Sequence, residues 1–167
     1  MSENHIDAAE YRTVLGRYPT GVTLVSAIDD DGPFSMVIGS FGSVSLDPPL
    51  VQFMPGKQSE TWKRIHATGS YCVNVLGEHQ LDLSNSFFNN KEVDPFEAID
   101  WAAGPTGSPI IAGCVAWIDC SIEAIHEAGD HYIVVGAVEA MGEDTSGNKP
   151  LLFLGGAYGS FGTLPEN

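Results

Sequence analysis

The chain has 167 residues, with 22 acidic and 7 basic side chains and a formal net charge of -15. So few Lys and Arg residues argue against nucleic-acid binding, which requires the neutralisation of phosphates. The length predicts a single domain over residues 1–167. The lack of a secretion signal, and of an apolar run of the roughly 18 residues that a membrane span needs, predicts a cytoplasmic protein.

Near the N-terminus, apolar residues recur at i, i+3, i+4 and i+7, which is the spacing of an amphipathic helix. Asp7 and Glu10 fit a capping arrangement at its start, and Pro19 and Gly21 end it. The residues of this apolar stripe are Tyr11, Val14, Leu15 and Tyr18.

The next part of the chain predicts strands separated by turns. The expected elements are a strand over 22–28, a turn over 29–33, a Ser- and Gly-rich strand over 35–45 and a strand over 50–54. Ser59 and Glu60 then mark the start of a helix that runs to about residue 68.

The second half adds more strands than helices. The expected elements are a strand over 70–76, a helix over 78–88, a Pro- and Gly-rich connection over 89–113, and strands over 114–125, 131–141 and 150–154. This pattern predicts a mainly β fold, a closed antiparallel barrel with peripheral helices.

The three cysteines are interpreted as small buried hydrophobes in a reducing compartment. Cys114 and Cys120 are six residues apart in one predicted strand. Extended chain separates them by roughly 20 Å, which is beyond the reach of a disulfide. A catalytic thiol at Cys72 stays open as an alternative, although Cys72 has no basic neighbour in the sequence.

Two segments could bind a ligand through small or charged groups. In 35–49, Ser and Gly residues leave backbone N–H groups open to something laid across the strand, or else permit tight packing of neighbouring strands. In 53–61, Lys57 offers a charge, and Ser59 and Thr61 offer hydroxyls beside a helix N-terminus, which suits a phosphate. On the residues alone, a capped surface helix with solvated lysines is the simpler interpretation of 53–61.

A third candidate is the turn Gly129-Asp130-His131. An imidazole can donate a hydrogen bond and stack on a planar ring, although a histidine that is satisfied by local backbone is the plainer interpretation. His126 lies five residues from His131, but the two have no third ligand at metal spacing, so no metal site is expected.

Several motifs in order resemble the flavin reductase-like family, the split-barrel flavoproteins. They are Tyr18-Pro19-Thr20-Gly21-Val22, Ser40-Phe41, Ser43-Val44-Ser45-Leu46-Asp47-Pro48-Pro49-Leu50-Val51, Val73-Asn74-Val75-Leu76 and Gly129-Asp130-His131. The resemblance is closest to the reductase components of two-component flavin-dependent monooxygenases. It implies an antiparallel split barrel that forms a homodimer, with flavin sites near the subunit interface.

The resemblance also implies an activity, NAD(P)H:flavin oxidoreductase. Hydride would pass from nicotinamide C4 to flavin N5, and the reduced FMN or FAD would leave for a separate monooxygenase. Such a step depends on stacking the two rings and needs no acid or base from the protein, so no catalytic residue is expected. The scarcity of Arg favours NADH over NADPH.

By the same resemblance, His131 and Tyr158 would position the nicotinamide. The residues implied in flavin binding are Val37, Ile38, Gly39, Ser40, Phe53, Met54, Pro55, Lys57, Ser59, Thr61, Phe87 and Phe88. Relatives commonly carry Thr at the place of Val37 and a hydroxyl residue at the place of Gly39. Losing both removes two hydrogen bonds of about 1 kcal/mol each.

Two other functions stay open from the sequence. A protein that holds FMN tightly would act as an electron carrier or sensor rather than as a turnover reductase. An oxidase of the pyridoxine type on a related barrel is less favoured, because the basic substrate-binding pattern of such oxidases is not found.

Overall fold

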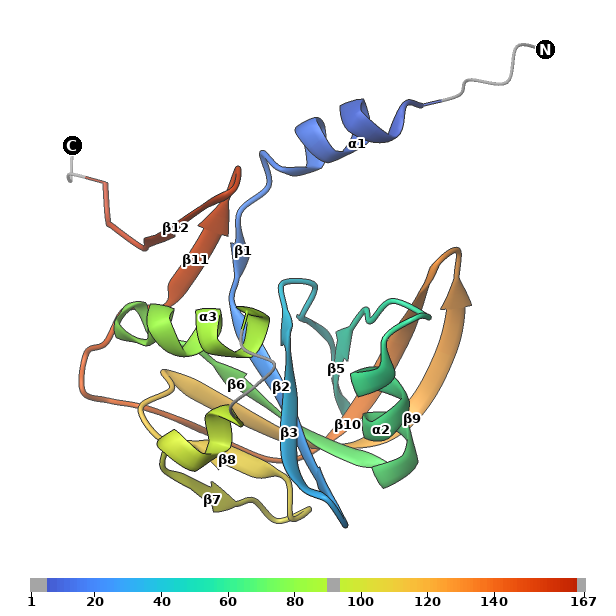
Figure 1. Cartoon of the computed structure of the whole chain (residues 1–167), viewed down its shortest axis with the longest axis vertical. Helices are drawn as coiled ribbons and strands as arrows, with labels where there is room; N and C mark the ends of the chain where they lie inside the picture. The colour runs from blue at the N-terminus through green and yellow to red at the C-terminus, as the bar shows by residue number, and fades with distance from the viewer. Residues whose placement is uncertain (1–5, 90–93, 165–167) are drawn as a thin grey trace.

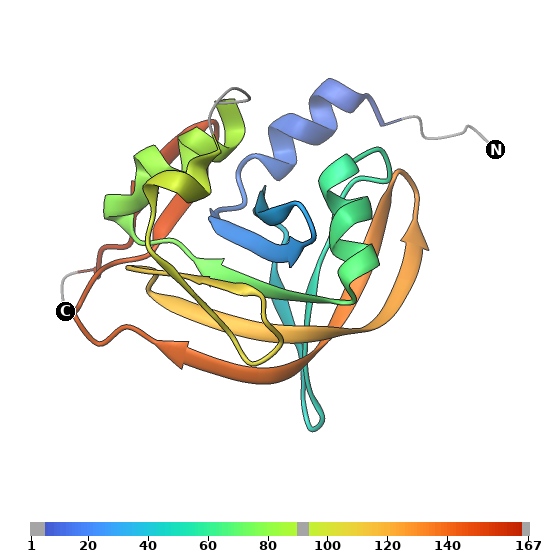
Figure 2. The ribbon, with the colours of Figure 1, turned by 60° about the horizontal axis from the view of Figure 1, so that its bottom comes forward.

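The computed structural model describes residues 6–89 and 94–164. Its body is a seven-stranded antiparallel sheet in the order β3-β2-β6-β9-β10-β5-β4 (Figure 1). These strands are β2 (Thr23–Asp29), β3 (Gly32–Ile38), β4 (Gly42–Leu46), β5 (Pro49–Phe53), β6 (Ser70–Val75), β9 (Ala116–Ala128) and β10 (His131–Glu143). The long strands β9 and β10 curve around the molecule (Figure 2) and give the sheet its barrel shape.

Smaller elements surround this sheet. Strands β1 (Thr20–Gly21), β11 (Leu151–Leu154) and β12 (Ala157–Ser160) form a three-stranded sheet, and β7 (Trp101–Ala103) pairs with β8 (Pro109–Ile111). The helices are α1 (Ala8–Leu15), α2 (Glu60–Thr68) and α3 (Leu81–Asn89), with 3-10 turns η1 (Glu78–Gln80) and η2 (Pro95–Ala98). None of the helices in the described residues is long and apolar enough to cross a membrane.

The barrel is split between its two edge strands, β3 and β4, which residues 39–41 connect. Beside this split, a side-chain contact continues the β4–β5 pairing by one step. The Ser40 hydroxyl accepts a hydrogen bond from the Met54 N–H at 2.9 Å and donates one to the Met54 carbonyl at 3.2 Å. The fold is therefore the predicted antiparallel split barrel, but the expected closed hydrogen-bond ladder is open at this point.

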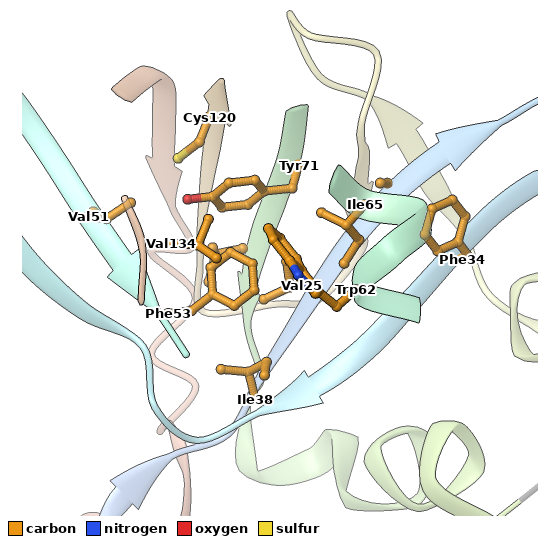
Figure 3. Close-up of a cluster of buried hydrophobic side chains, with 12 residues drawn as sticks. Val25, Phe34, Ile38, Val51, Phe53, Trp62, Ile65, Tyr71, Cys120 and Val134 are labelled. Carbon is orange, nitrogen blue, oxygen red and sulfur yellow. The ribbon is translucent and has the colours of Figure 1, made fainter. Parts of the chain in front are cut away.

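The barrel interior is filled by a cluster of aromatic and aliphatic side chains (Figure 3). Phe53 is central, because its ring meets the edges of Trp62, at 5.8 Å between centroids, and Tyr71, at 5.0 Å. Trp62 and Ile65 are the buried residues of α2. Burial of each such side chain contributes about 1.5–3 kcal/mol, which fixes α2 over this end of the barrel.

A second cluster lies between the sheet, α3 and the β7–β8 hairpin, and it includes Leu24, Leu76, Phe96 and Ile111. Polar groups hold the hairpin in place. The Asn74 side chain accepts a hydrogen bond from the Ile111 N–H at 2.7 Å and donates one to Ser26 Oγ at 2.8 Å. These groups are buried, so each unpaired one would cost about 1–3 kcal/mol.

Two expected helix N-caps and one expected turn are confirmed, but the first helix ends at Leu15 with Gly16 as its cap, before the expected end at Pro19 and Gly21. Asp7 accepts hydrogen bonds from the first turn of α1, and Ser59 caps α2. Gly129, at φ +59°, forms the turn between β9 and β10.

Several expectations need correction. The 35–45 strand divides into β3 and β4, and the 89–113 connection contains η2, β7 and β8. The helix expected over 78–88 begins as the 3-10 turn η1, and the Gly-rich tail pairs as β12. Cys114 precedes β9, which begins at Ala116, and packs in the second cluster, while Cys120 packs in the first.

The cysteines are free and buried, as predicted. Burial raises the pKa of the Cys114 and Cys120 thiols to about 12 and also raises the pKa of Cys72. A thiol with a raised pKa stays protonated and is a poor nucleophile. The structure therefore gives no support to a catalytic Cys72.

An amphipathic helix usually buries its apolar stripe against the core, and helix α1 does not. None of its residues is buried, and it projects from the end of the molecule (Figure 1). The exposed fractions of its stripe are 57% for Tyr11, 60% for Val14 and 48% for Leu15.

Candidate active site

A slot of about 410 Å³ opens where β3 ends. Its walls come from five elements and the chain beside them, and most of them are apolar. The lining residues are Thr20, Gly21, Val22, Val37, Ile38, Gly39, Phe88, Phe153 and Tyr158. A mostly apolar pocket of this volume lies in the range of small-molecule binding sites.

Gly39 allows a close approach of two elements that line the slot. A Cβ atom at Gly39 would lie 3.0 Å from Thr20 Oγ1, closer than side chains normally approach. The glycine therefore lets β1 lie directly against the end of β3. Its lack of a side chain also leaves backbone groups accessible to a ligand.

Aromatic rings line the other side of the slot. Tyr158 meets Phe153 edge-on, with 5.1 Å between the ring centroids. Tyr158 is 37% exposed and Phe88 is 70% exposed, so both rings present free surface. Stacking on such rings is the usual way to bind a planar heterocycle.

A second group of predicted residues meets at the turn between β9 and β10. The Lys57 N–H donates to the Asp130 carbonyl at 2.9 Å, and Gly56 pairs with His131 as an isolated bridge. The candidate phosphate segment and the Gly-Asp-His turn thus lie together, although more than 70 residues separate them in the sequence. We refer to Lys57, Asp130 and His131 as the Lys57 corner.

Two hydrogen-bonded pairs of charged or titratable side chains lie at the Lys57 corner. Lys57 Nζ donates to Glu127 at 2.8 Å, and this hydrogen bond raises the pKa of Lys57 and lowers that of Glu127. His131 Nδ1 lies 2.8 Å from Asp130 Oδ1, and the hydrogen bond with His131 lowers the pKa of Asp130. Lys57 is therefore a firmly protonated cation, and Asp130 holds the His131 ring by its Nδ1 atom.

Two further basic residues close to Lys57 in the sequence, Lys63 and Arg64, are also paired. Lys63 Nζ lies 2.6 Å from Glu60. Arg64 makes two 2.8 Å hydrogen bonds to Asp29 and stacks over the Phe34 ring at 3.9 Å. Arg64 therefore ties α2 to the β2–β3 hairpin and does not belong to the Lys57 corner.

Some predicted ligand residues have structural partners instead of free surface. Phe53 and Pro55 are fully buried, and Phe87 packs edge-on against Phe96 at 5.3 Å. The Ser40 hydroxyl is engaged by Met54. Ser59 Oγ accepts the Trp62 N–H at 3.1 Å as a helix cap.

Sequence reasoning missed part of the site. Thr20, Gly21 and Val22 line the slot, although they stood out in the sequence only as part of a family motif. Phe153 was also missed. It lies in the predicted strand over 150–154, where an aromatic residue is most simply interpreted as core. Glu127 was missed because nothing in the local sequence indicates that it pairs with Lys57.

The fold is a split barrel with an apolar slot at the end of β3. The sequence matches the family described as "Flavin reductase like domain" over residues 15–162, and the chain belongs to this family.

Individual relatives agree with this assignment. A flavin reductase of Pseudomonas putida is 48% identical over 95% of this chain and 93% of the relative. The reductase subunit HsaB of a flavin-dependent monooxygenase of Mycobacterium tuberculosis is 46% identical over 92% of this chain and 82% of the relative. A solved structure of the NADH:FAD oxidoreductase SgcE6 of Streptomyces globisporus is 34% identical, has a TM-score of 0.87, and covers 98% of this chain and 100% of that chain.

Proposed function

We propose that this chain is an NADH-dependent flavin reductase that reduces FMN or FAD and supplies it to a separate flavin-dependent monooxygenase. The observation that carries the proposal is the apolar slot beside Gly39, in a chain that belongs to the flavin reductase-like family. The relatives named as a monooxygenase reductase subunit and as an NADH:FAD oxidoreductase support the partner and the choice of NADH.

The residues present fit a flavin. Gly39 leaves backbone accessible in the slot and lets Thr20 approach it closely, and Phe88 and Tyr158 offer ring surface. Lys57, with Ser59 and Thr61 near it in sequence, would hold the phosphate through a charge-assisted contact. When bound, flavin supplies the N5 atom that accepts a hydride from nicotinamide C4.

The contribution of the protein is binding and orientation. The apolar slot walls would cover one face of the ring, and His131 Nδ1 lies 2.8 Å from the Asp130 carboxylate. No side chain needs to take up or release a proton in a hydride transfer, so His131 and Tyr158 act as positioning residues.

A homodimer is part of the proposal. The exposed apolar stripe of α1 supports it, since a contiguous apolar surface on a helix usually meets another protein surface. The occupant that we propose is a second copy of this chain.

The test is steady-state NADH oxidation with and without added free FMN or FAD. A reductase that releases its product turns over many times per protein and depends on the free flavin concentration. A protein that purifies with FMN and oxidises only one NADH per bound flavin would contradict the proposal and indicate an electron carrier.

A further inference from the structure

Three residues of the slot come from one row of the small sheet formed by β1, β11 and β12, which lie side by side in Figure 1. In the strand register, Thr20 pairs with Phe153, and Phe153 pairs with Tyr158. Residues that lie directly opposite each other on paired strands share one face of a sheet, and all three line the slot. The small sheet therefore presents a hydroxyl and two aromatic rings to a ligand in the slot.

Polar side-chain groups are scarce in the slot. None of its lining residues is charged, and only Thr20 and Tyr158 carry a hydroxyl. Thr20 is half-buried. In the part of the chain that the structure describes, Thr23 Oγ1 donates to the Ile38 carbonyl at 2.8 Å, whereas Thr20 Oγ1 has no hydrogen-bond partner. The Thr20 hydroxyl is thus available to a ligand.

The Thr20 hydroxyl also occupies the space that a side chain of residue 39 would need. A Cβ at Gly39 would lie 3.0 Å from Thr20 Oγ1, but 3.6 Å from Thr20 Cβ, which is an ordinary contact. Gly39 does not have a positive φ, so its backbone conformation is open to other residues. The Thr20 hydroxyl, and not the backbone, is therefore what limits residue 39 to glycine.

We propose that the Thr20 hydroxyl binds the amide edge of the ring that enters the slot, and that it reaches this edge from β1 because Gly39 leaves the space on β3 empty. The inference rests on the proposed function, in which a flavin enters the slot. The pyrimidine part of a flavin carries carbonyl and N–H groups, and a hydroxyl can donate to the first and accept from the second. The carboxamide of nicotinamide has the same chemistry, and the experiment separates the two sources.

Two variants separate the hydroxyl of Thr20 from its methyl group. Thr20→Val keeps the shape and loses the hydroxyl, whereas Thr20→Ser keeps the hydroxyl and loses the methyl group. We expect Thr20→Val to raise the Kd for riboflavin and the Kd for FMN by the same factor, about fivefold, because the contact is with the ring. Thr20→Ser should leave both constants within about twofold of the wild type. Fluorescence quenching on flavin-free protein measures them.

Lys57→Ala is the matched control, because the proposed contact of Lys57 is with the phosphate, which riboflavin lacks. This variant should weaken the binding of FMN and leave that of riboflavin unchanged. Thr20→Val should instead weaken both. Equal melting temperatures of the variants would show that the fold is intact.

A double variant tests the space that Thr20 and Gly39 share. Thr20→Ala removes the hydroxyl, so that a Cβ at residue 39 would meet the Cβ of residue 20 at 3.6 Å. Adding Gly39→Ser to Thr20→Ala would supply a hydroxyl from β3 in place of the one lost from β1. We expect Thr20→Ala to raise the Kd for riboflavin about fivefold, and the double variant to recover most of that loss. Gly39→Ser alone should weaken binding, because its Cβ presses on Thr20 Oγ1.

The outcomes distinguish the ligands of Thr20 from a purely structural role. A higher KM for NADH in Thr20→Val, with unchanged Kd values for riboflavin and FMN, supports the contact and assigns it to the carboxamide of nicotinamide. The proposal is overturned if Thr20→Val and Thr20→Ser behave alike in every constant, if Thr20→Val weakens FMN but not riboflavin, or if the double variant recovers none of a loss seen in Thr20→Ala. Failure of the proposed function is distinct from these results, because the wild-type protein would then bind no flavin.

Discussion

At the scale of single residues, Gly39 offers a direct test of the slot. The Cβ of Gly39→Ala would press on Thr20 Oγ1 at 3.0 Å, and relieving such overpacking costs about 1–3 kcal/mol. We expect β1 to shift and the Kd for FMN to rise several-fold, measured by fluorescence quenching. Gly42→Ala is the control, because a Cβ at Gly42 meets nothing within 4 Å. Equal effects of the two variants on the Kd would contradict the assignment.

Glu127 tests the role of Lys57. Its carboxylate holds Lys57 Nζ at 2.8 Å and so competes with a flavin phosphate for the same cation. We expect Glu127→Gln to tighten FMN binding, and Lys57→Ala to weaken it about tenfold, because a hydrogen bond to a charged group contributes about 1.5–3 kcal/mol. Titration of FMN by isothermal calorimetry measures both.

The ion pair between Lys63 and Glu60 is the control for this experiment. It is also a Lys–Glu pair, and both of its residues lie on α2. Glu60→Gln should leave the Kd for FMN unchanged. If Glu127→Gln and Lys57→Ala also leave it unchanged, Lys57 is not a phosphate ligand.

The sequence predicts residue types at the site better than it predicts their partners. Lys57 and His131 stand out by chemistry and motif, and the structure places their segments side by side. The carboxylate of Glu127 and the engagement of Ser40 by Met54 depend on how distant strands fold together. No local pattern encodes such contacts.

At the scale of elements, an ion pair between Arg64 and Asp29 joins α2 to the β2–β3 hairpin. The hydrogen bond from Arg64 lowers the pKa of Asp29 below its ordinary value of 3.8. A lowered folded-state pKa means that the pair stabilises the protein above the ordinary pKa, and that this stability is lost as the pH falls through the lowered value.

We therefore expect the difference in unfolding free energy between the wild type and Asp29→Asn to be largest at neutral pH. The difference should shrink as the pH falls below about 4. Urea unfolding at several pH values measures it, with Asp30→Asn, at the exposed neighbouring position, as the control. A difference that stays constant down to the lowest pH would mean that the ionised pair does not cause it.

Long elements with regular patterns could be predicted, and short ones could not. Alternation of apolar and polar residues indicated β9, the Gly129-Asp130 turn indicated the start of β10, and Ser59 indicated the start of α2. The split at residues 39–41 was hidden because small residues continue the pattern of a strand. Strands β7 and β8 have three residues each, too few for a period, and Asn74 of another strand fixes their position.

At the scale of the whole molecule, the proposed nicotinamide residues belong to two different groups within one chain. Tyr158 lines the slot, whereas His131 lies at the Lys57 corner. Helix α1 leads into β1, which forms a wall of the slot, and yet α1 buries none of its own residues. A second copy of the chain packed against α1 would therefore also brace the slot.

The proposed dimer predicts that Val14→Asp shifts the protein to monomers in sedimentation velocity, because the substitution puts a charge into the centre of the apolar stripe. Thr13→Asp makes the same change in charge at an exposed position, roughly on the opposite face of the helix at 100° per residue, and should leave the dimer intact. Because β1 connects α1 to the slot, loss of the dimer should also weaken FMN binding. A wild-type protein that sediments as a monomer would contradict the dimer, and the apolar stripe would then belong to a different partner.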